Sequence, residues 1–220
     1  MLVADVAGPP NLILEPLGRA TATLPGEIST DDDVLGFAWT RTLEVMTHHP
    51  GPLKARAVVQ LCGAFPGAGS GRTSVEIVRD VARPVEGPAF FYYAPFVTPD
   101  APAADAIRRQ ADVKAAQAMY AQVSKAVVTT GSWQAGHFSL WDAVGSDLRD
   151  DAVAAGAVAE ICGGIFLDRD GTPVATTLSD VTIGITPKEL KAIPEVIGVA
   201  FGVEKSSAIR RVQSAASCSP

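Results

Sequence analysis

One stretch of the chain decides its fold: Asp33-Val34-Leu35-Gly36-Phe37-Ala38-Trp39-Thr40-Arg41-Thr42. Its apolar run, Val34–Ala38, is continuous rather than alternating, which is typical of a strand buried on both faces of a parallel sheet. Thr40 then offers a side-chain oxygen as the N-cap of a helix that extends to Met46. A buried strand that leads directly into a helix is half of a βαβ unit, so the stretch predicts an α/β fold.

The same alternation of apolar runs and helical patterns continues along the chain. Besides Val34–Ala38, we predict strands at Ala57–Leu61, Ala89–Tyr93, Ala126–Thr130 and Val196–Ala200, and extended structure over Val174–Ile185. We predict helices at Leu17–Leu24, Thr40–Met46, the segment with Val75, Val78 and Val81, Ala103–Ser124 in one or two pieces, Ser146–Ala155, the segment begun by Thr186-Pro187-Lys188-Glu189, and Glu204–Val212. The sequence therefore predicts a three-layer, Rossmann-like α/β domain with a mainly parallel sheet.

Composition narrows the class of protein. The 220 residues are 47% hydrophobic and carry a formal net charge of −6, with a sequence pI near 5.0. A chain of this length buries roughly 70% of its unfolded surface, and its apolar content is typical of a globular domain. The acidic balance argues against this chain coating nucleic acid by itself. The sequence has no apolar stretch of membrane-spanning length and no basic leader, so we expect a cytoplasmic protein without membrane contact.

The cysteines and histidines do not form a recognisable site. Cys62, Cys162 and Cys218 are odd in number and widely spaced, which argues against a disulfide framework or a structural zinc, and the first two are expected to be buried. The adjacent His48 and His49 point in different directions on a helix and are expected at a helix end. We therefore predict no metal and no cofactor.

Ligands of parallel sheets bind at the carboxyl ends of the strands, so four loops are candidates: residues 38–42, 62–73, 130–133 and 201–205. The glycine loop in the second of them fits neither nucleotide motif. Arg72 stands where the third glycine of a dinucleotide fingerprint is needed, and Pro66 stands where a Walker A loop begins with glycine. The loop is either plain surface structure or a set of N–H groups facing a small anion. Ser132 lacks a nucleophile elbow, which argues against a hydrolase.

Taken together, the loops resemble the effector-binding domain of SorC/DeoR-type bacterial sugar-responsive transcriptional regulators. The similarity extends from about Leu17 to about Arg210 and rests on segments in the family's order. These segments are 17–20, 33–42, 58–63, 94–95, 131–133, 155–163, 178–185, 193–197 and 204–209. The resemblance implies a fold similar to those of glucosamine-phosphate deaminase, ribose-phosphate isomerase and coenzyme A transferase domains, used to sense a sugar phosphate rather than to convert it.

The resemblance also implies a ligand site, partners and domain limits. The residues expected to contact a phosphorylated sugar are Trp39, Thr40, Arg41, Thr42, Gly63, Ala64, Gly131, Ser132, Asp168 and Lys205. Ligand binding is expected to rearrange a homo-oligomer and so control operator DNA, which would be held by a helix-turn-helix domain absent from this chain. The effector-binding domain is expected at residues 17–211, after an N-terminal segment 1–16 and before a tail at 212–220.

The chain departs from the family pattern at several positions. Ala64 and Thr40 stand where the family usually has glycine, while Gly164 and Val181 stand where it usually has arginine. Two cations that could serve a ligand are therefore missing. Lys205 is a cation in the first turn of a predicted helix, where it opposes the helix dipole unless an anion is bound.

Each of these features also has a plainer interpretation. On that interpretation Trp39 covers the sheet and Arg41 is a solvated helix residue. The aromatic run Phe90–Tyr93 either fills a strand or forms a surface for self-association. Two other functions remain open: a sugar-phosphate isomerase or deaminase on the same fold, and a scaffold that binds nothing. An isomerase needs a carboxylate base, and the loop ends offer only Asp142, Asp168, Asp180 and Glu204.

Overall fold

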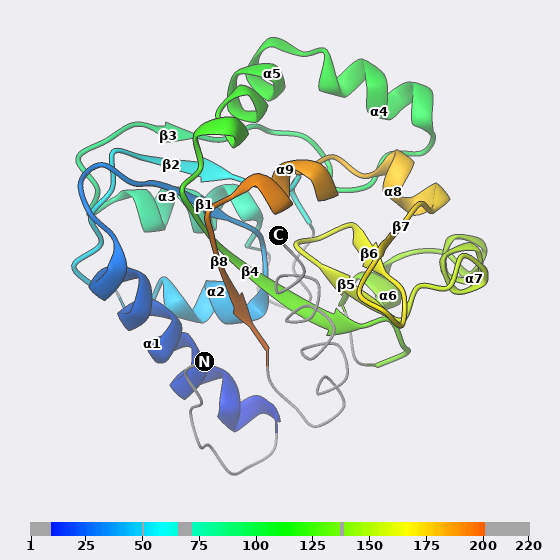
Figure 1. The fold of residues 1–220 in the computed structure, drawn as a ribbon, viewed down its shortest axis with the longest axis horizontal. Helices are drawn as coiled ribbons and strands as arrows, with labels where there is room; N and C mark the ends of the chain where they lie inside the picture. The colour runs from blue at the N-terminus through cyan, green and yellow to red at the C-terminus, as the bar shows by residue number, and fades with distance from the viewer. Residues whose placement is uncertain (1–9, 50, 66–71, 137–138, 201–220) are drawn as a thin grey trace.

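A curled, mainly parallel sheet forms the centre of the molecule (Figure 1). The computed structural model describes residues 10–49, 51–65, 72–136 and 139–200. In this part of the chain, the parallel strands run in the order β3-β2-β1-β4-β8, and β5, β6 and β7 continue from the end of β4 as an antiparallel extension. The strands are β1 Val34–Phe37, β2 Ala57–Gln60, β3 Ala89–Phe90, β4 Lys125–Ser132, β5 Ala159–Ile161, β6 Ile165–Leu167, β7 Pro173–Val174 and β8 Glu195–Val199.

The parallel strands are buried on both faces, which gives the domain three layers. Along β1, Val34 packs into one apolar cluster and Leu35 and Phe37 pack into a second, because successive side chains of a strand point to opposite faces. β4 divides in the same way, with Val128 in the first cluster and Val127 in the second. The predicted strands Val34–Ala38, Ala57–Leu61, Ala126–Thr130 and Val196–Ala200 correspond to β1, β2, β4 and β8 of the parallel sheet. The predicted three-layer fold class is confirmed.

Helices cover the two faces. The cluster around Phe37 is closed by α2 (Arg41–Met46) and α3 (Ser74–Ala82), with α1 (Pro10–Ile28) packed against α2. The opposite cluster is closed by η1 (Tyr120–Gln122), α6 (Ser139–Ala143), α7 (Ser146–Ala154), α8 (Thr177–Val181) and α9 (Pro187–Ala192). The helices α4 (Ala101–Arg108) and α5 (Ala111–Ala118) form an arm above the sheet with a small cluster of their own (Figure 1).

The predicted helix starts and helix faces hold in detail. The Thr40 side chain accepts from the Leu43 N–H at 3.1 Å and caps α2. Thr186 and Glu189 form a reciprocal capping box at the start of α9, with Pro187 at the first helical position. Val75, Val78 and Val81 are buried on one face of α3, as their helical spacing predicts. The segment Ala103–Ser124 is helical in two pieces, followed by one 3₁₀ turn.

Several predictions were wrong in extent or type. The strand predicted over Ala89–Tyr93 ends at Phe90, because the Tyr92 N–H donates to the side chain of Gln60 instead of continuing a ladder. The extended segment predicted over Val174–Ile185 contains α8, whose start is capped by Thr176. The helix α6 was not predicted. Glu204–Val212 lies outside the described residues.

The first helix is longer than predicted. α1 runs from Pro10 to Ile28 and contains Pro16 and Pro25, whereas we predicted a helix over Leu17–Leu24. The Thr21 hydroxyl bonds the Leu17 carbonyl at 2.7 Å inside the helix. Gly18 allows close packing, because a Cβ there would lie 2.5 Å from Cγ1 of Val45 on α2. Packing against α2 therefore stabilises a helix that local propensity alone disfavours.

Candidate functional site

The candidate site lies where the order of the parallel strands reverses. From β1 the chain moves outward to β2 and then β3, whereas β4 and β8 lie on the other side of β1. Phe37 of β1 pairs with Val127, and β4 continues to Ser132 beyond that register. The loop after β1 and the end of β4 therefore share one edge of the sheet. Open α/β sheets bind their ligands at such a switch point.

Three loops converge at this edge around Cys62. The Trp39 backbone N–H points to Cys62 Sγ at 3.2 Å, which joins the loop after β1 to the loop after β2. The turn between β5 and β6 lies on the other side, since a Cβ built on Gly163 would be 3.5 Å from the Cβ of Cys62. The first two of these loops, residues 38–42 and 62–73, were predicted to lie at one edge, and the contact between Trp39 and Cys62 agrees with that placement. The turn between β5 and β6 was not among the predicted loops.

Trp39 is a structural residue of the site. Its ring is partly buried against Phe65, with 4.9 Å between the ring centroids, and its Nε1 donates to the Arg72 carbonyl at 3.0 Å. It packs against both apolar clusters of the domain. The plainer interpretation, that Trp39 covers the sheet, therefore describes its contacts in the structure.

The start of α2 presents three neighbouring side chains of different kinds. The Thr40 oxygen caps the helix, Thr42 is 3% exposed, and Arg41 is exposed. Arg41 is thus a cation at the rim of the switch point. A hydroxyl and a guanidinium are both suitable donors to a phosphate oxygen.

Gly63 and Ala64 lie at the site, but their amides are already engaged. Gly63 N–H donates to the Ile183 carbonyl at 2.8 Å, and Ala64 N–H donates to the Ala94 carbonyl at 2.7 Å. A Cβ on Gly63 would lie 2.5 Å from the Pro95 carbonyl oxygen. Glycine is therefore required at position 63 for packing against the backbone at Pro95, and these two N–H groups do not face a ligand.

Gln60, which the sequence analysis missed, organises the root of the same loop. Its fully buried amide donates to the Cys62 carbonyl at 2.7 Å and to Ser74 Oγ at 3.0 Å, and its oxygen accepts from the Tyr92 N–H at 3.0 Å. Ser74 Oγ in turn donates to the Gly63 carbonyl at 3.0 Å. A buried amide must find such partners. The signal in the sequence was a polar residue at the end of an apolar strand.

The far side of the site is formed by the end of β4 and by β5. Gly131 and Ser132 are buried and pair with Glu160 and Ala159 of β5. Glu160 is fully buried, and its carboxylate accepts from the Gly164 N–H. The sequence analysis did not name Glu160 as a site residue, although it stands in one of the segments that carry the resemblance.

The geometry explains why arginine is absent at position 164. Three consecutive residues of the β5–β6 turn have positive φ angles, which are 61° at Cys162, 75° at Gly163 and 123° at Gly164. A Cβ on Gly164 would lie 2.7 Å from Cγ2 of Thr182. An L side chain at 164 would therefore clash and would also be strained. At the second departure, Val181 is 4% exposed and belongs to the apolar core.

Asp168 shapes a turn of its own. Its carboxylate accepts from the N–H groups of Asp170 at 2.8 Å and Thr172 at 2.9 Å, in the connection between β6 and β7. The row Ser132, Ala159, Leu167 crosses from β4 to β6, so Asp168 lies about 10 Å from the end of β4 at the usual strand spacing. Lys205 lies outside the described residues.

Two buried thiols and two buried phenols behind the site are neutral. Burial raises the pKa of the Cys62 thiol to about 12 and also raises the pKa of Cys162. Burial likewise raises the pKa values of Tyr92 and Tyr120, whose hydroxyl oxygens lie 3.3 Å apart. Both thiols and both phenols are therefore protonated at neutral pH, and neither buried cysteine is a ready nucleophile.

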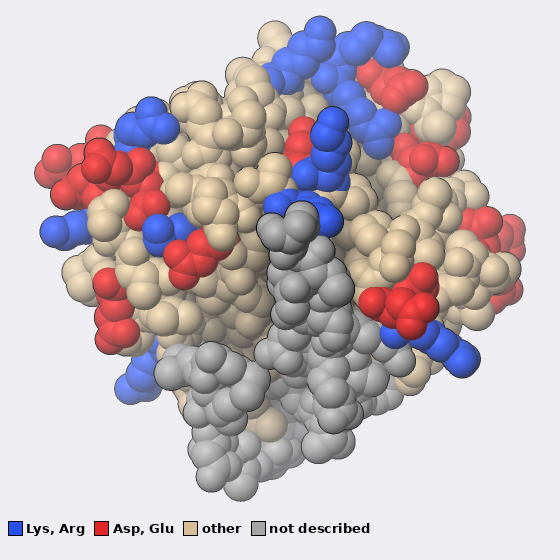
Figure 2. Space-filling model, in the orientation of Figure 1, with Lys and Arg blue, Asp and Glu red and all other residues tan. Residues whose placement is uncertain are grey.

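Other chemistries find little support in the described part of the chain. It holds no group of three or more His, Cys, Asp or Glu side chains able to bind a metal ion, and no helix in it is long and apolar enough to cross a membrane. Asp142 and Asp180 are exposed, and Glu204 lies outside the described residues. On the face seen in Figure 2, basic and acidic side chains are interspersed, so this side offers no uniformly basic surface for nucleic acid.

Comparison with known proteins identifies the domain. Residues 2–217 match the model of a family described as "Putative sugar-binding domain". The chain belongs to this family. It is 26% identical over 204 residues to the sorbitol operon regulator of Klebsiella pneumoniae, covering 89% of this chain and 64% of that protein. It is also 26% identical over 189 residues to the transcriptional regulator YjhU of Escherichia coli, covering 84% of this chain and 57% of YjhU.

A solved structure shows the same fold. A DeoR family transcriptional regulator from Listeria monocytogenes superposes with a TM-score of 0.83 at 20% identity, over 98% of this chain and 86% of that chain. The chain spans less than two thirds of the length of each of the two curated relatives named above. The predicted resemblance to SorC/DeoR sugar-binding domains is confirmed. Because the matched family is a sugar-binding domain and the named relatives are regulators, the prediction that the chain is not an enzyme is also confirmed.

Proposed function

We propose that this sugar-binding domain is the effector sensor of a cytoplasmic transcriptional regulator and that its effector is a phosphorylated sugar. The effector would bind at the switch point between β1 and β4 and shift the population of oligomeric arrangements. Operator DNA would be held by a helix-turn-helix domain outside these 220 residues. The effector-binding unit would comprise residues 17–211, with 1–16 and 212–220 as flanking segments.

One observation carries the proposal: the start of α2 projects from the switch point with Arg41 exposed beside Thr40. Arg41 and Lys205 would supply charge to the phosphate, while Thr42 and Ser132 would face the sugar hydroxyls. The relatives support the sugar part, because one of them is named for the sorbitol operon. Since the Gly63 and Ala64 amides bond carbonyls of the protein, the phosphate would depend on side chains more than on that loop's backbone.

The proposal includes a homo-oligomer. The aromatic surface available for self-association is smaller than the run Phe90–Tyr93 indicated. Tyr92 is fully buried, whereas Tyr93 is 67% exposed and packs edge to face against Phe91 at 5.9 Å. Phe91 and Tyr93 are therefore the aromatic pair that a second copy would cover.

A thermal shift screen tests the proposed function. The panel contains the phosphates of sorbitol, fructose, ribose and glucosamine together with the unphosphorylated sugars. At 100 times its dissociation constant an effector stabilises the protein by about 2.7 kcal/mol, which corresponds to a rise in Tm of roughly 5–10 °C for a domain of this size. We expect this rise with one sugar phosphate and a smaller one with its unphosphorylated sugar.

Two variants locate the phosphate. Lys205→Ala and Arg41→Ala should each abolish most of the shift, because a charge-assisted bond to the phosphate is lost. Lys114→Ala, which removes an exposed cation on α5, should leave the shift intact. A panel without any shift would instead favour a scaffold that binds no sugar phosphate.

A further inference from the structure

Arg72 contacts both ends of α2, the short helix that carries the candidate ligand residues. Before the helix, Trp39 Nε1 donates to the Arg72 carbonyl at 3.0 Å. After the helix, the Arg72 guanidinium donates from Nη1 to Thr47 Oγ1 at 3.2 Å and lies 3.3 Å from His48 Nε2. A helix of six residues is about 9 Å long, so one arginine can reach from one end to the other.

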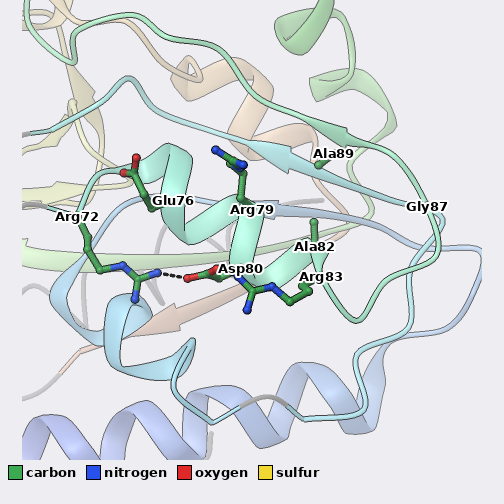
Figure 3. A pocket seen from close by; sticks show the side chains of 8 residues that line it. All are labelled: Arg72, Glu76, Arg79, Asp80, Ala82, Arg83, Gly87 and Ala89. Carbon is green, nitrogen blue, oxygen red and sulfur yellow. Dashed lines mark hydrogen bonds and ion pairs between the residues drawn. The ribbon is translucent and has the colours of Figure 1, made fainter.

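The guanidinium is held from a third side by α3. Arg72 Nη2 forms an ion pair with Asp80, which the close-up in Figure 3 shows, and the two side chains are 24% and 27% exposed. Because both groups are partly buried and a guanidinium is a planar fork with fixed donor directions, this contact orients the side chain as well as anchoring it. The fork therefore connects α3 to the end of α2.

The groove in Figure 3 is not itself an anion site. Asp80 bonds Arg83 Nη2 at 2.6 Å through its other oxygen, so it lies between the two guanidinium groups of Arg72 and Arg83. Arg79 extends on the other side of the helix, away from this pair (Figure 3). The arrangement is that of a clasp between elements rather than of a converging set of donors.

α2 needs such a clasp. An isolated helix of six residues is far below the length at which helices are stable in water. The buried residues Leu43 and Met46 pack into the apolar cluster and hold α2 against the sheet. α1 packs against the same helix, and the direction of Arg41 and Thr42 also depends on how the two ends of α2 are held. Trp39 on one side and Thr47 on the other are the two points at which Arg72 restrains them.

We propose that Arg72 is a positioning residue for effector binding: it clasps both ends of α2 and so sets the direction of Thr40, Arg41 and Thr42 at the ligand site. The proposal rests on the proposed function for its ligand, but its structural part, the restraint of α2, can be measured without one. In the sequence, Arg72 stood out only because it replaces the third glycine of a dinucleotide-binding motif. In this proposal it acts through α2 and not on a nucleotide.

The test compares Arg72→Met with Arg83→Met. Both changes remove a guanidinium from Asp80 and keep an unbranched side chain. The side chain of Arg83, however, is 80% exposed and pairs with Asp80 one turn back on α3, not with α2. Hydrogen exchange is followed on a peptide covering residues 40–48. Arg72→Met releases the Thr47 end and keeps the backbone carbonyl that bonds Trp39, so we expect exchange at the Thr47 end of α2 to become at least ten times faster. In Arg83→Met it should stay within twofold of wild type.

Affinity is measured on the same proteins by calorimetry with the sugar phosphate that gives the largest thermal shift. We expect at least a tenfold weaker Kd for Arg72→Met and less than a twofold change for Arg83→Met. Arg72→Lys should not restore binding, since one ammonium cannot hold Thr47 and Asp80 as the fork does. Weaker binding with unchanged exchange would show that Arg72 touches the ligand directly, which overturns a positioning role.

The remaining outcomes also decide the proposal. If wild type binds no member of the panel, the proposed function fails, and the exchange data alone judge the clasp. Equal exchange in Arg72→Met and Arg83→Met overturns the clasp whatever the ligand does. If Arg72→Met does not fold, Asp80→Asn weakens the ion pair that orients the Arg72 guanidinium and changes no residue of α2, and a loosening of residues 44–48 is then required by the proposal.

Discussion

The two edges of the parallel sheet use polar residues in opposite ways. At the amino edge, the Asp33 carboxylate accepts from Ser124 Oγ at 2.7 Å, from Lys125 Nζ at 2.9 Å and from the Thr30 N–H at 2.8 Å. At the carboxyl edge, the buried amide of Gln60 and the buried thiol of Cys62 are neutral, and Arg41 is exposed. The first edge satisfies its charges internally, whereas the second keeps a charge available.

Because of this difference, we expect the amino edge to contribute to stability and the carboxyl edge to ligand binding. Burial by itself raises the pKa of Asp33, but the hydrogen bonds from Ser124, Lys125 and Thr30 outweigh it and hold the pKa below its usual value. Such a group stabilises β1 and β4 where they begin. At the other edge, the neutral thiols and phenols carry no cation, so the charge of an incoming phosphate is left to cations at the rim such as the exposed Arg41. Substitutions at the two edges should therefore change different measurements.

The largest expected effect is at the amino edge. Asp33→Ala removes the nearer carboxylate partner of Lys125, whose side chain is 17% exposed and which keeps Glu195 at 3.6 Å. Breaking a largely buried pair from one side costs about 3 kcal/mol. Urea unfolding should show this loss, while the Kd for a sugar phosphate should stay within twofold of wild type. A large loss of affinity at unchanged stability would break the separation of the two edges.

The next largest effect is expected at the carboxyl edge, where one substitution should change both stability and binding. Gln60→Met keeps the volume but leaves the Cys62 carbonyl, Ser74 Oγ and the Tyr92 N–H without their amide partner. Unpaired buried polar groups of this kind cost about 2 kcal/mol in total stability. Because the same amide holds the root of the loop at Gly63, we expect a weaker Kd as well. Unchanged binding would mean that the loop root does not shape the site.

The pH dependence sharpens the assignment of Asp33. Its folded pKa is depressed, so its contribution to stability is fully present above the ordinary value of 3.8 and is lost as the pH falls below that value toward the folded pKa. Wild type should therefore lose stability steeply below about pH 4, and Asp33→Asn should lose less over that interval. Parallel stability curves for the two proteins would contradict the ion pair as the main stabilising contact there.

The smallest effect on stability is expected from the exposed aromatic pair. Tyr93→Ser removes a ring that is 67% exposed, so the free energy of unfolding should change by less than about 0.5 kcal/mol. If a second copy covers this surface, sedimentation should show a lower average mass for the variant than for wild type at the same concentration. An unchanged mass would remove Phe91 and Tyr93 from the self-association surface.

The sequence predicted the fold better than the site, for a physical reason. The strand Val34–Ala38 and the Thr40 cap depend on patterns within a few residues, and both are confirmed. The segment at Thr177–Val181 was taken as extended because its cap residue, Thr176, was overlooked. The early end of β3 depends on a bond between Tyr92 and Gln60, which are 32 positions apart. No local pattern contains such information.

The site residues likewise divide into those found from the order of the sequence and those whose roles come from contacts between distant elements. Sequence order placed Trp39 and Gly63 at the same edge, and contacts through Cys62 and the Ile183 carbonyl join their loops to the rest of the site. The roles of Arg72 and Gln60 come from bonds between distant elements and could not be read from spacing. The absence of arginine at position 164 was visible in the sequence. Its reason, the close approach of Gly164 to Thr182, is visible only in the folded structure.

The most direct test of the account is a map of amide chemical shifts on binding. A ¹H–¹⁵N spectrum of the labelled protein is recorded with and without the sugar phosphate that gives the largest thermal shift. We predict that the largest changes fall at the carboxyl edge, on Arg41, Thr42, Ser132 and the Trp39 indole. Thr30, Asp33 and Ser124 at the amino edge should not move. Saturating shifts centred on the amino edge, or none at the switch point, would contradict the account.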